Sequence, residues 1–153
     1  MGDGSTALEP SVLKTIKKML GLSDSYDHFD LDIIVNINTI FSNLSQMGIG
    51  QITGTETREL TDAYGNVILD ADGLPTTETV NVVDSFSIDD NTETWEQFFA
   101  GHADANLVQQ VKTYMYIKVK LLFDPPANGN LLSAMKENAR ELEVRLYTQV
   151  GGY

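Results

Sequence analysis

Phe123-Asp124-Pro125-Pro126 separates two amphipathic stretches of the chain, and this junction decides the fold. The stretch before it reads Val111-Lys112-Thr113-Tyr114-Met115-Tyr116-Ile117-Lys118-Val119-Lys120-Leu121-Leu122, and the stretch after it covers residues 128–148. Proline lacks the backbone N–H that a helix interior needs, and its ring collides with the preceding turn. Pro125 also keeps Asp124 out of the α region. We therefore expect an antiparallel pair of helices, with Asp124, Pro125 and Pro126 as the interhelical turn.

The two helices beside this turn have recognisable starts and apolar faces. The first begins near Asp104, and the second follows Asn128. Their helical spacing predicts two apolar faces. The expected residues are Leu107, Val111, Tyr114, Met115, Ile117, Leu121 and Leu122 in the first helix, and Leu131, Leu132, Met135, Ala139, Leu142 and Leu146 in the second.

Two more helices are predicted nearer the N-terminus. Pro10 or Ser11 opens a short one that stops at Gly21. Asp27 is a suitable N-cap for a long one that ends before Gly48. The apolar face of this long helix is expected at Leu31, Ile34, Val35, Asn38, Phe41 and Leu44.

Residues 51–90 differ from the rest, because Thr and Val dominate and the helical period disappears. Two turn signals occur there, at Asp62-Ala63-Tyr64-Gly65-Asn66 and Asp70-Ala71-Asp72-Gly73-Leu74-Pro75. They share a style without forming a periodic repeat. We expect two or three antiparallel strands and a short strand at Phe86-Ser87-Ile88, followed by a helical turn that Thr92 caps and that carries Trp95, Phe98 and Phe99.

The fold class is therefore mainly α. We predict a small helical bundle, with three long helices and a short N-terminal one, and an inserted antiparallel β-hairpin or meander. One domain is expected over residues 1–153, with the β-rich insertion at about 51–90 and a short C-terminal tail at 149–153.

The chain has 153 residues, no cysteine and a formal net charge of −12. Residues 51–90 hold nine acidic side chains against one base, so this segment alone carries −8. Such a protein is poorly suited to grip nucleic acid through phosphates, which requires clustered Lys and Arg. An acidic wall can still surround DNA without holding it. No apolar run reaches the roughly 20 residues of a membrane span, and no secretory signal is visible.

No catalytic, metal or cofactor-binding constellation is found. The segment Asp70-Ala71-Asp72-Gly73 lacks the remaining ligands of a calcium loop, so it is better explained as a turn. The acids at residues 24, 27, 30 and 32 fit helix capping, and His28 and His102 each stand alone. Without a nucleophile elbow or a phosphate loop, an enzyme is poorly supported.

Lys112, Lys118 and Lys120 lie with tyrosines in one helix and allow three interpretations. They can form a solvated face, a nucleic-acid surface, or a subunit contact in which lysine from one copy meets acid from the next. Trp95 is interpreted as a packing residue of the core or of an interface. We assign all four residues to a candidate subunit interface.

Several segments, in order, resemble the head–tail connector (adaptor) family of tailed bacteriophages. The segments are residues 29–38, Gln46-Met47-Gly48-Ile49-Gly50, Phe86-Ser87-Ile88-Asp89-Asp90, Thr92-Glu93-Thr94-Trp95-Glu96-Gln97-Phe98, residues 112–126 and Glu141-Leu142-Glu143-Val144-Arg145-Leu146. Family members commonly pass almost directly from the Gly48-Ile49-Gly50 region to the Phe86 strand, so the acidic insertion is a departure. Its role is not implied by the resemblance.

The resemblance implies a structural virion protein of the neck, assembled in the cytoplasm of the bacterial host. Such connectors form a homo-oligomeric ring, typically a dodecamer, beneath the portal protein. The ring extends the channel through which double-stranded DNA passes, and it presents a surface to a stopper or tail-completion protein. The tail at Gln149, Val150, Gly151, Gly152 and Tyr153 is the implied portal contact. No cofactor and no membrane are implied.

Two alternatives of other classes remain. The first is a monomeric module that binds a protein partner through the acidic β insertion. The second is a metal-dependent hydrolase that uses the aspartates.

Overall fold

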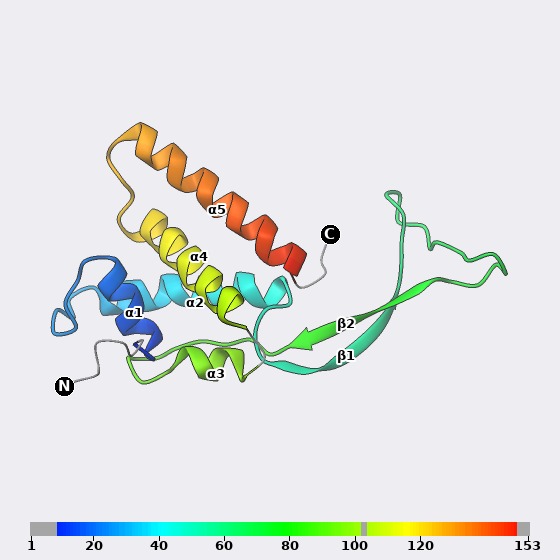
Figure 1. Ribbon diagram of the computed structural model, residues 1–153, viewed down its shortest axis with the longest axis horizontal. Helices are drawn as coiled ribbons and strands as arrows, with labels where there is room; N and C mark the ends of the chain where they lie inside the picture. Colours follow the sequence, from blue (N-terminus) through cyan, green and yellow to red (C-terminus); the bar gives the residue numbers. More distant parts are fainter. Residues whose placement is uncertain (1–8, 102–103, 150–153) are drawn as a thin grey trace.

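A computed structural model describes residues 9–101 and 104–149. In this part of the chain, helices form a bundle and two strands form an arm that projects from it (Figure 1). The elements are α1 (Val12–Met19), α2 (Asp30–Gln46), β1 (Ile52–Glu59), β2 (Thr77–Val83), α3 (Trp95–Phe99), α4 (Ala105–Phe123) and α5 (Gly129–Gln149). The predicted mainly α fold with an inserted β-hairpin is confirmed.

Helix α2 lies in the centre of the bundle and supplies much of its core. Ile33, Ile37, Phe41 and Leu44 are fully buried, and Ile40 is almost so. The expected apolar face was wrong at Leu31 and Val35, which are 74% and 57% exposed, and right at Phe41 and Leu44, which are buried. Apolar residues occur all around the first half of this helix, so two different faces satisfy the 3.6-residue period. The face with Ile33, Ile37 and Ile40 is the buried one, because the helix packs against α4 and against the rings of Phe86, Trp95 and Phe98.

An ion pair fixes the connection between α1 and α2. Lys17 is only 2% exposed, and its Nζ lies 2.8 Å from Asp30 Oδ1 and donates to the carbonyl of Asp24. The N-cap position of α2 is Phe29, which makes no side-chain cap bond. The expectation of Asp27 as N-cap was therefore wrong: Asp27 instead accepts a backbone bond from Asp30 in the turn before the helix.

Helices α4 and α5 run antiparallel, side by side (Figure 1). Asp104 Oδ1 accepts from the N–H of Leu107 and caps α4, and Asn128 Oδ1 accepts from the first turn of α5. The backbone leaves α4 at Asp124, so Asp124, Pro125 and Pro126 lie between the helices. Two expected face residues, Leu122 and Leu131, are more than half exposed, whereas Val119 is fully buried.

The segment after the arm is attached to α2 by the side chain of Asn38. Its Nδ2 donates to the Ile88 carbonyl at 3.0 Å, and its Oδ1 accepts from the Ile88 N–H at 2.8 Å. The predicted strand at residues 86–88 is therefore wrong, since an amide side chain takes the place of a neighbouring strand. Ile88 is 1% exposed, so both bonds satisfy buried backbone groups.

Thr94 caps the short helix α3. The prediction that Thr92 caps it was wrong. Thr94 and Gln97 form a capping box, in which each side chain bonds the backbone of the other. Thr92 donates through its N–H and its hydroxyl to Asp90 Oδ1. These hydrogen bonds lower the pKa of the Asp90 carboxyl.

The strands β1 and β2 pair antiparallel from Ile52↔Val83 to Glu59↔Thr77, with an irregularity between Ile52 and Gly54. The arm begins and ends at one point of the bundle, because Asp84 N–H donates to the Gln51 carbonyl at 3.0 Å. Gly50 precedes this point with a φ of +148°, and a Cβ there would lie 3.4 Å from the Phe98 ring. The insertion therefore ends near residue 84, and residues 85–90 belong to the bundle.

The tip of the arm contains two turns with the same hydrogen bonds. Asp62 Oδ1 accepts from the N–H groups of Tyr64 and Asn66, and Asp70 Oδ1 accepts from those of Asp72 and Leu74. Backbone bonds also join Leu60, Ile68 and Thr76 in a closed triangle. The two predicted turns are thus copies of one structure eight positions apart, which corrects the expectation that they do not repeat.

We predict that Asn38→Ala lowers the free energy of unfolding by about 2–3 kcal/mol, because it leaves two buried backbone groups of Ile88 without a partner. Chemical denaturation measures the change. Asn43→Ala is the matched control, since this amide of α2 makes no side-chain hydrogen bond to a described residue, and a change within about 0.5 kcal/mol is expected. Equal losses for both variants would contradict the proposed importance of the Asn38 bonds.

Candidate functional site

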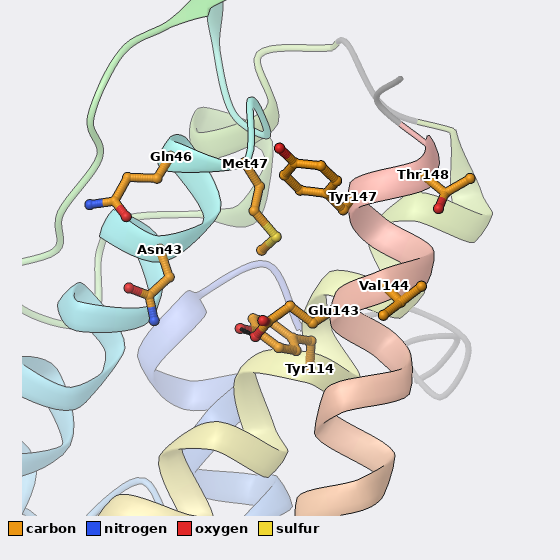
Figure 2. Close-up of a pocket in the computed structure, with 8 residues that line it drawn as sticks. All are labelled: Asn43, Gln46, Met47, Tyr114, Glu143, Val144, Tyr147 and Thr148. Atoms are coloured by element: carbon orange, nitrogen blue, oxygen red, sulfur yellow. Dashed lines mark hydrogen bonds between the residues drawn. The ribbon is translucent and has the colours of Figure 1, made fainter. Parts of the chain in front are cut away.

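A cleft of about 620 Å³ opens where the C-terminal ends of α2 and α5 lie above α4 (Figure 2). Its volume falls within the range of about 300–1,000 Å³ that is usual for binding clefts. Its lining combines two apolar and two amide side chains with two tyrosines, one threonine and one carboxylate. The lining residues are Asn43, Gln46, Met47, Tyr114, Glu143, Val144, Tyr147 and Thr148.

Tyr114 and Glu143 join α4 to α5 at the base of this cleft. Tyr114 Oη donates to Glu143 Oε2 at 2.7 Å, and the Tyr114 side chain is fully buried. Burial is the main cause that raises the pKa of the Tyr114 hydroxyl, and the hydrogen bond and charge of Glu143 raise it further. The tyrosine therefore remains a neutral donor at physiological pH.

A second hollow of about 280 Å³ continues along the same side of α5. Its lining includes Lys118, Lys136 and Arg140, and it shares Glu143 with the first cleft. We call the two hollows together the α5 flank. Its end near α2 is partly apolar, with Val144 61% and Tyr147 45% exposed, and its other end carries the three bases.

Trp95 and Lys112 lie in the core of the subunit. Trp95 is 4% exposed, and its Nε1 donates to Thr15 Oγ1 at 3.0 Å. Lys112 is 8% exposed, and its Nζ lies 5.6 Å from the centroid of the Trp95 ring. Burial lowers the pKa of the Lys112 ammonium. The ring face of Trp95 compensates part of the lost hydration of this cation.

Lys118 and Lys120 are half-buried and lie nearer the surface. Lys118 Nζ lies 6.0 Å from the centroid of the Tyr114 ring. Lys120 Nζ lies 3.0 Å from Asp124 Oδ2, so the end of α4 and the interhelical turn are joined by an ion pair. The four residues assigned to the subunit interface are therefore not equivalent, and Lys118 is the one that lines the α5 flank.

The tail assigned to portal contact begins at Gln149. Its Nε2 donates to Gln110 Oε1 at 2.8 Å, which ties the last turn of α5 to the first half of α4. Val150, Gly151, Gly152 and Tyr153 lie outside the described residues. Gln149 is the last residue of α5 and directly follows Thr148, which lines the cleft.

The described part of the chain contains no group of three or more His, Asp or Glu side chains arranged to hold a metal ion. His28 packs edge-on against Phe29, with the ring centroids 4.7 Å apart. No described helix combines the length and apolar character that crossing a membrane requires.

The sequence did not indicate the cleft or the Tyr114–Glu143 bond. The lining residues come from three helices, and the two bonded residues are 29 positions apart. One signal was present: Val144 and Tyr147 are apolar residues beside the stripe of α5. A second signal was present in the arm, where the apolar residues Ile68, Leu69 and Leu74 lie between or within the two turns.

A family model described as phage connector protein matches residues 12–82 and 76–152. The first range runs through the arm to residue 82, and the two ranges overlap at residues 76–82 on β2. A search of curated proteins and a search of solved structures each found no match.

We predict that Tyr114→Phe lowers the free energy of unfolding by about 1–2 kcal/mol, since it removes a hydrogen bond to a carboxylate and leaves the packed ring in place. Tyr116→Phe is the control, because the Tyr116 hydroxyl bonds no described side chain or backbone group. Denaturation curves of both variants measure the difference. Equal losses would show that the Tyr114–Glu143 bond contributes nothing specific.

The lowered pKa of Lys112 gives a pH prediction. Between the lowered pKa and the ordinary value of 10.5, the unfolded chain binds more protons than the native chain, so stability rises with pH through this window. Lys112→Met should remove that rise and should equal or exceed the wild type in stability at about pH 8. Tyr114 acts in the opposite direction in both proteins, so its contribution cancels in the comparison.

Denaturation at about pH 8 and about pH 10 checks this prediction, with exposed Lys136→Met as control. An unchanged pH slope in Lys112→Met would contradict it.

Proposed function

Because the chain belongs to the phage connector protein family, we propose that it forms a ring beneath the portal of a tailed phage. Membership of the family gives the chain a structural role in joining head to tail. The finer proposal is a dodecamer that extends the DNA channel and carries the stopper or tail-completion protein. In the infected cell it would assemble in the cytoplasm and remain in the neck of the virion.

The family match, which together covers residues 12–152, carries this proposal. Two features of the subunit agree with it. The α4–α5 hairpin is a rigid unit joined by Tyr114–Glu143 and capped at both helix starts. The acidic arm and the base-lined α5 flank are two different surfaces, and a ring requires two different patches that meet head to tail.

The suspected portal contact remains the tail at residues 149–153, which follows directly on α5. A short peptide of this kind can add to a groove or a sheet of another protein. Double-stranded DNA would pass through the ring without specific binding, since a chain of −12 repels phosphate.

The rival proposal is a monomeric module that binds a protein through the arm. One observation favours it: the arm projects from the bundle and carries exposed apolar residues at its tip (Figure 1). A variant without residues 52–83 separates the two proposals. Joining Gln51 to Asp84 through Asn-Gly keeps their hydrogen bond, because a two-residue turn places the same carbonyl and N–H together.

We predict that this variant folds with the circular dichroism of a helical bundle and still docks on the cognate portal. Electron microscopy of portal mixed with either protein should show added density on the portal. A wild-type protein that remains monomeric at high concentration and also fails to bind portal would overturn the proposed function. A variant that folds and yet no longer docks would favour the arm as the binding element.

A further inference from the structure

We infer that the arm of one copy docks on the α5 flank of the next copy in the ring. The arm is residues 52–83, and the flank is the double hollow lined by Lys118, Lys136 and Arg140 at one end and by Met47, Val144 and Tyr147 at the other. This inference rests on the proposed ring and adds the identity of the two surfaces that meet.

Among the described elements, the strands of the arm pack extensively only on each other. They pair with each other, and along them only Ile52, Val80 and Val83 are half-buried. A two-stranded hairpin is marginally stable in water unless a further strand or a helix covers it. An element of this length is therefore expected to gain order from contact with another surface.

The tip presents apolar side chains from a fixed backbone. Tyr64 is 89%, Leu69 is 57% and Leu74 is 60% exposed. The two aspartate turns and the closed triangle of backbone bonds hold the loop that carries them. Exposed apolar residues on a pre-ordered backbone are typical of a protein contact.

The α5 flank provides an apolar wall and basic side chains, which the exposed apolar and acidic residues of the arm can contact. Near α2 its wall is partly apolar, through Met47, Val144 and Tyr147, and it surrounds a cavity of about 620 Å³. The carboxylate of Glu143 lies there too, but it already accepts the bond from Tyr114. The far end carries Lys118, Lys136 and Arg140; Arg140 also contacts Glu137 at 2.8 Å on the exposed surface.

Charge favours a second copy as the occupant. The arm has six acidic residues and one base, and that base, Arg58, is already paired with Glu78 across the strands at 3.1 Å. Residues 104–149 hold six of the ten basic residues of the chain together with five acids, so this part is nearly neutral while the arm carries −5. An acidic arm with an apolar tip thus complements a flank with a basic end and an apolar end.

The arm is also long enough to reach a neighbour. The eight residues of β1 extend about 26 Å at roughly 3.3 Å per residue, and the tip adds to this. A contact between two different patches is heterologous, and it closes into a ring when each copy repeats it.

Paired cysteines test this docking, because the chain has no cysteine of its own. Leu69→Cys at the tip is combined with Val144→Cys in the flank, and the protein is oxidised alone and on the cognate portal. We expect a ladder of disulfide-linked oligomers beyond the dimer. The matched control combines Leu69→Cys with Leu131→Cys, an exposed position on the same helix but outside the flank. Its cross-linking should be slower by roughly tenfold or more, since no contact raises the local thiol concentration.

Charge reversal provides a second, independent measurement. Lys136→Glu with Arg140→Glu should suppress the ladder, and Glu56→Lys with Glu59→Lys added to the same chain should restore it. Equal cross-linking at Val144 and Leu131, in solution and on portal, would overturn the docking.

The same experiment distinguishes this inference from the proposed function. Rings seen by electron microscopy together with equal cross-linking at both positions would reject the docking and leave the connector role intact. Absence of rings on portal would reject the role itself.

Discussion

The two hydrogen bonds between the Asn38 amide and the backbone of Ile88 hold the bundle together as one unit. They fix the chain where it returns from the arm, and Phe86 then packs against Phe41 and Phe98 with ring centroids 5.0 and 5.6 Å away. The next residues attach α1, because Val12 N–H donates to Glu93 and Trp95 N–H donates to Pro10. Helices α1 and α3 therefore occupy their places only if this segment does.

This arrangement explains how a long insertion is tolerated. The arm leaves and returns between Gln51 and Asp84, which are joined by a backbone bond, so its length does not alter the spacing of the helices. The entropy of closing a loop grows only slowly with its length. A connector bundle can thus carry an additional element whose surface is selected separately from the core.

Local rules predicted several parts of the fold that local chemistry controls, although they placed the caps of α2 and α3 wrongly at Asp27 and Thr92. Paired prolines ended α4, and Asp104 and Asn128 capped helices where their short polar side chains allowed it. The rules failed where distant residues decide. The face that α2 buries depends on α4, and the extended segment at Ile88 depends on an amide 50 positions earlier. The cleft is formed by residues of three helices, and no short sequence pattern in any one of them predicts it.

The charges of the arm also limit how copies of the chain can meet. Both strands of the hairpin have an open edge, and open edges tend to pair with other strands. Glu56, Glu59 and Glu78 lie along these strands. The only base in the two strands is Arg58, and it is paired with Glu78. Two arms brought edge to edge would therefore place like charges side by side, which is unfavourable. The same acids are favourable against a surface of opposite charge, and Lys118, Lys136 and Arg140 line one end of the α5 flank. Pairing between two arms is thus unfavourable, and contact between an arm and a different surface of the neighbouring copy is favoured. A ring requires such a contact between two different surfaces.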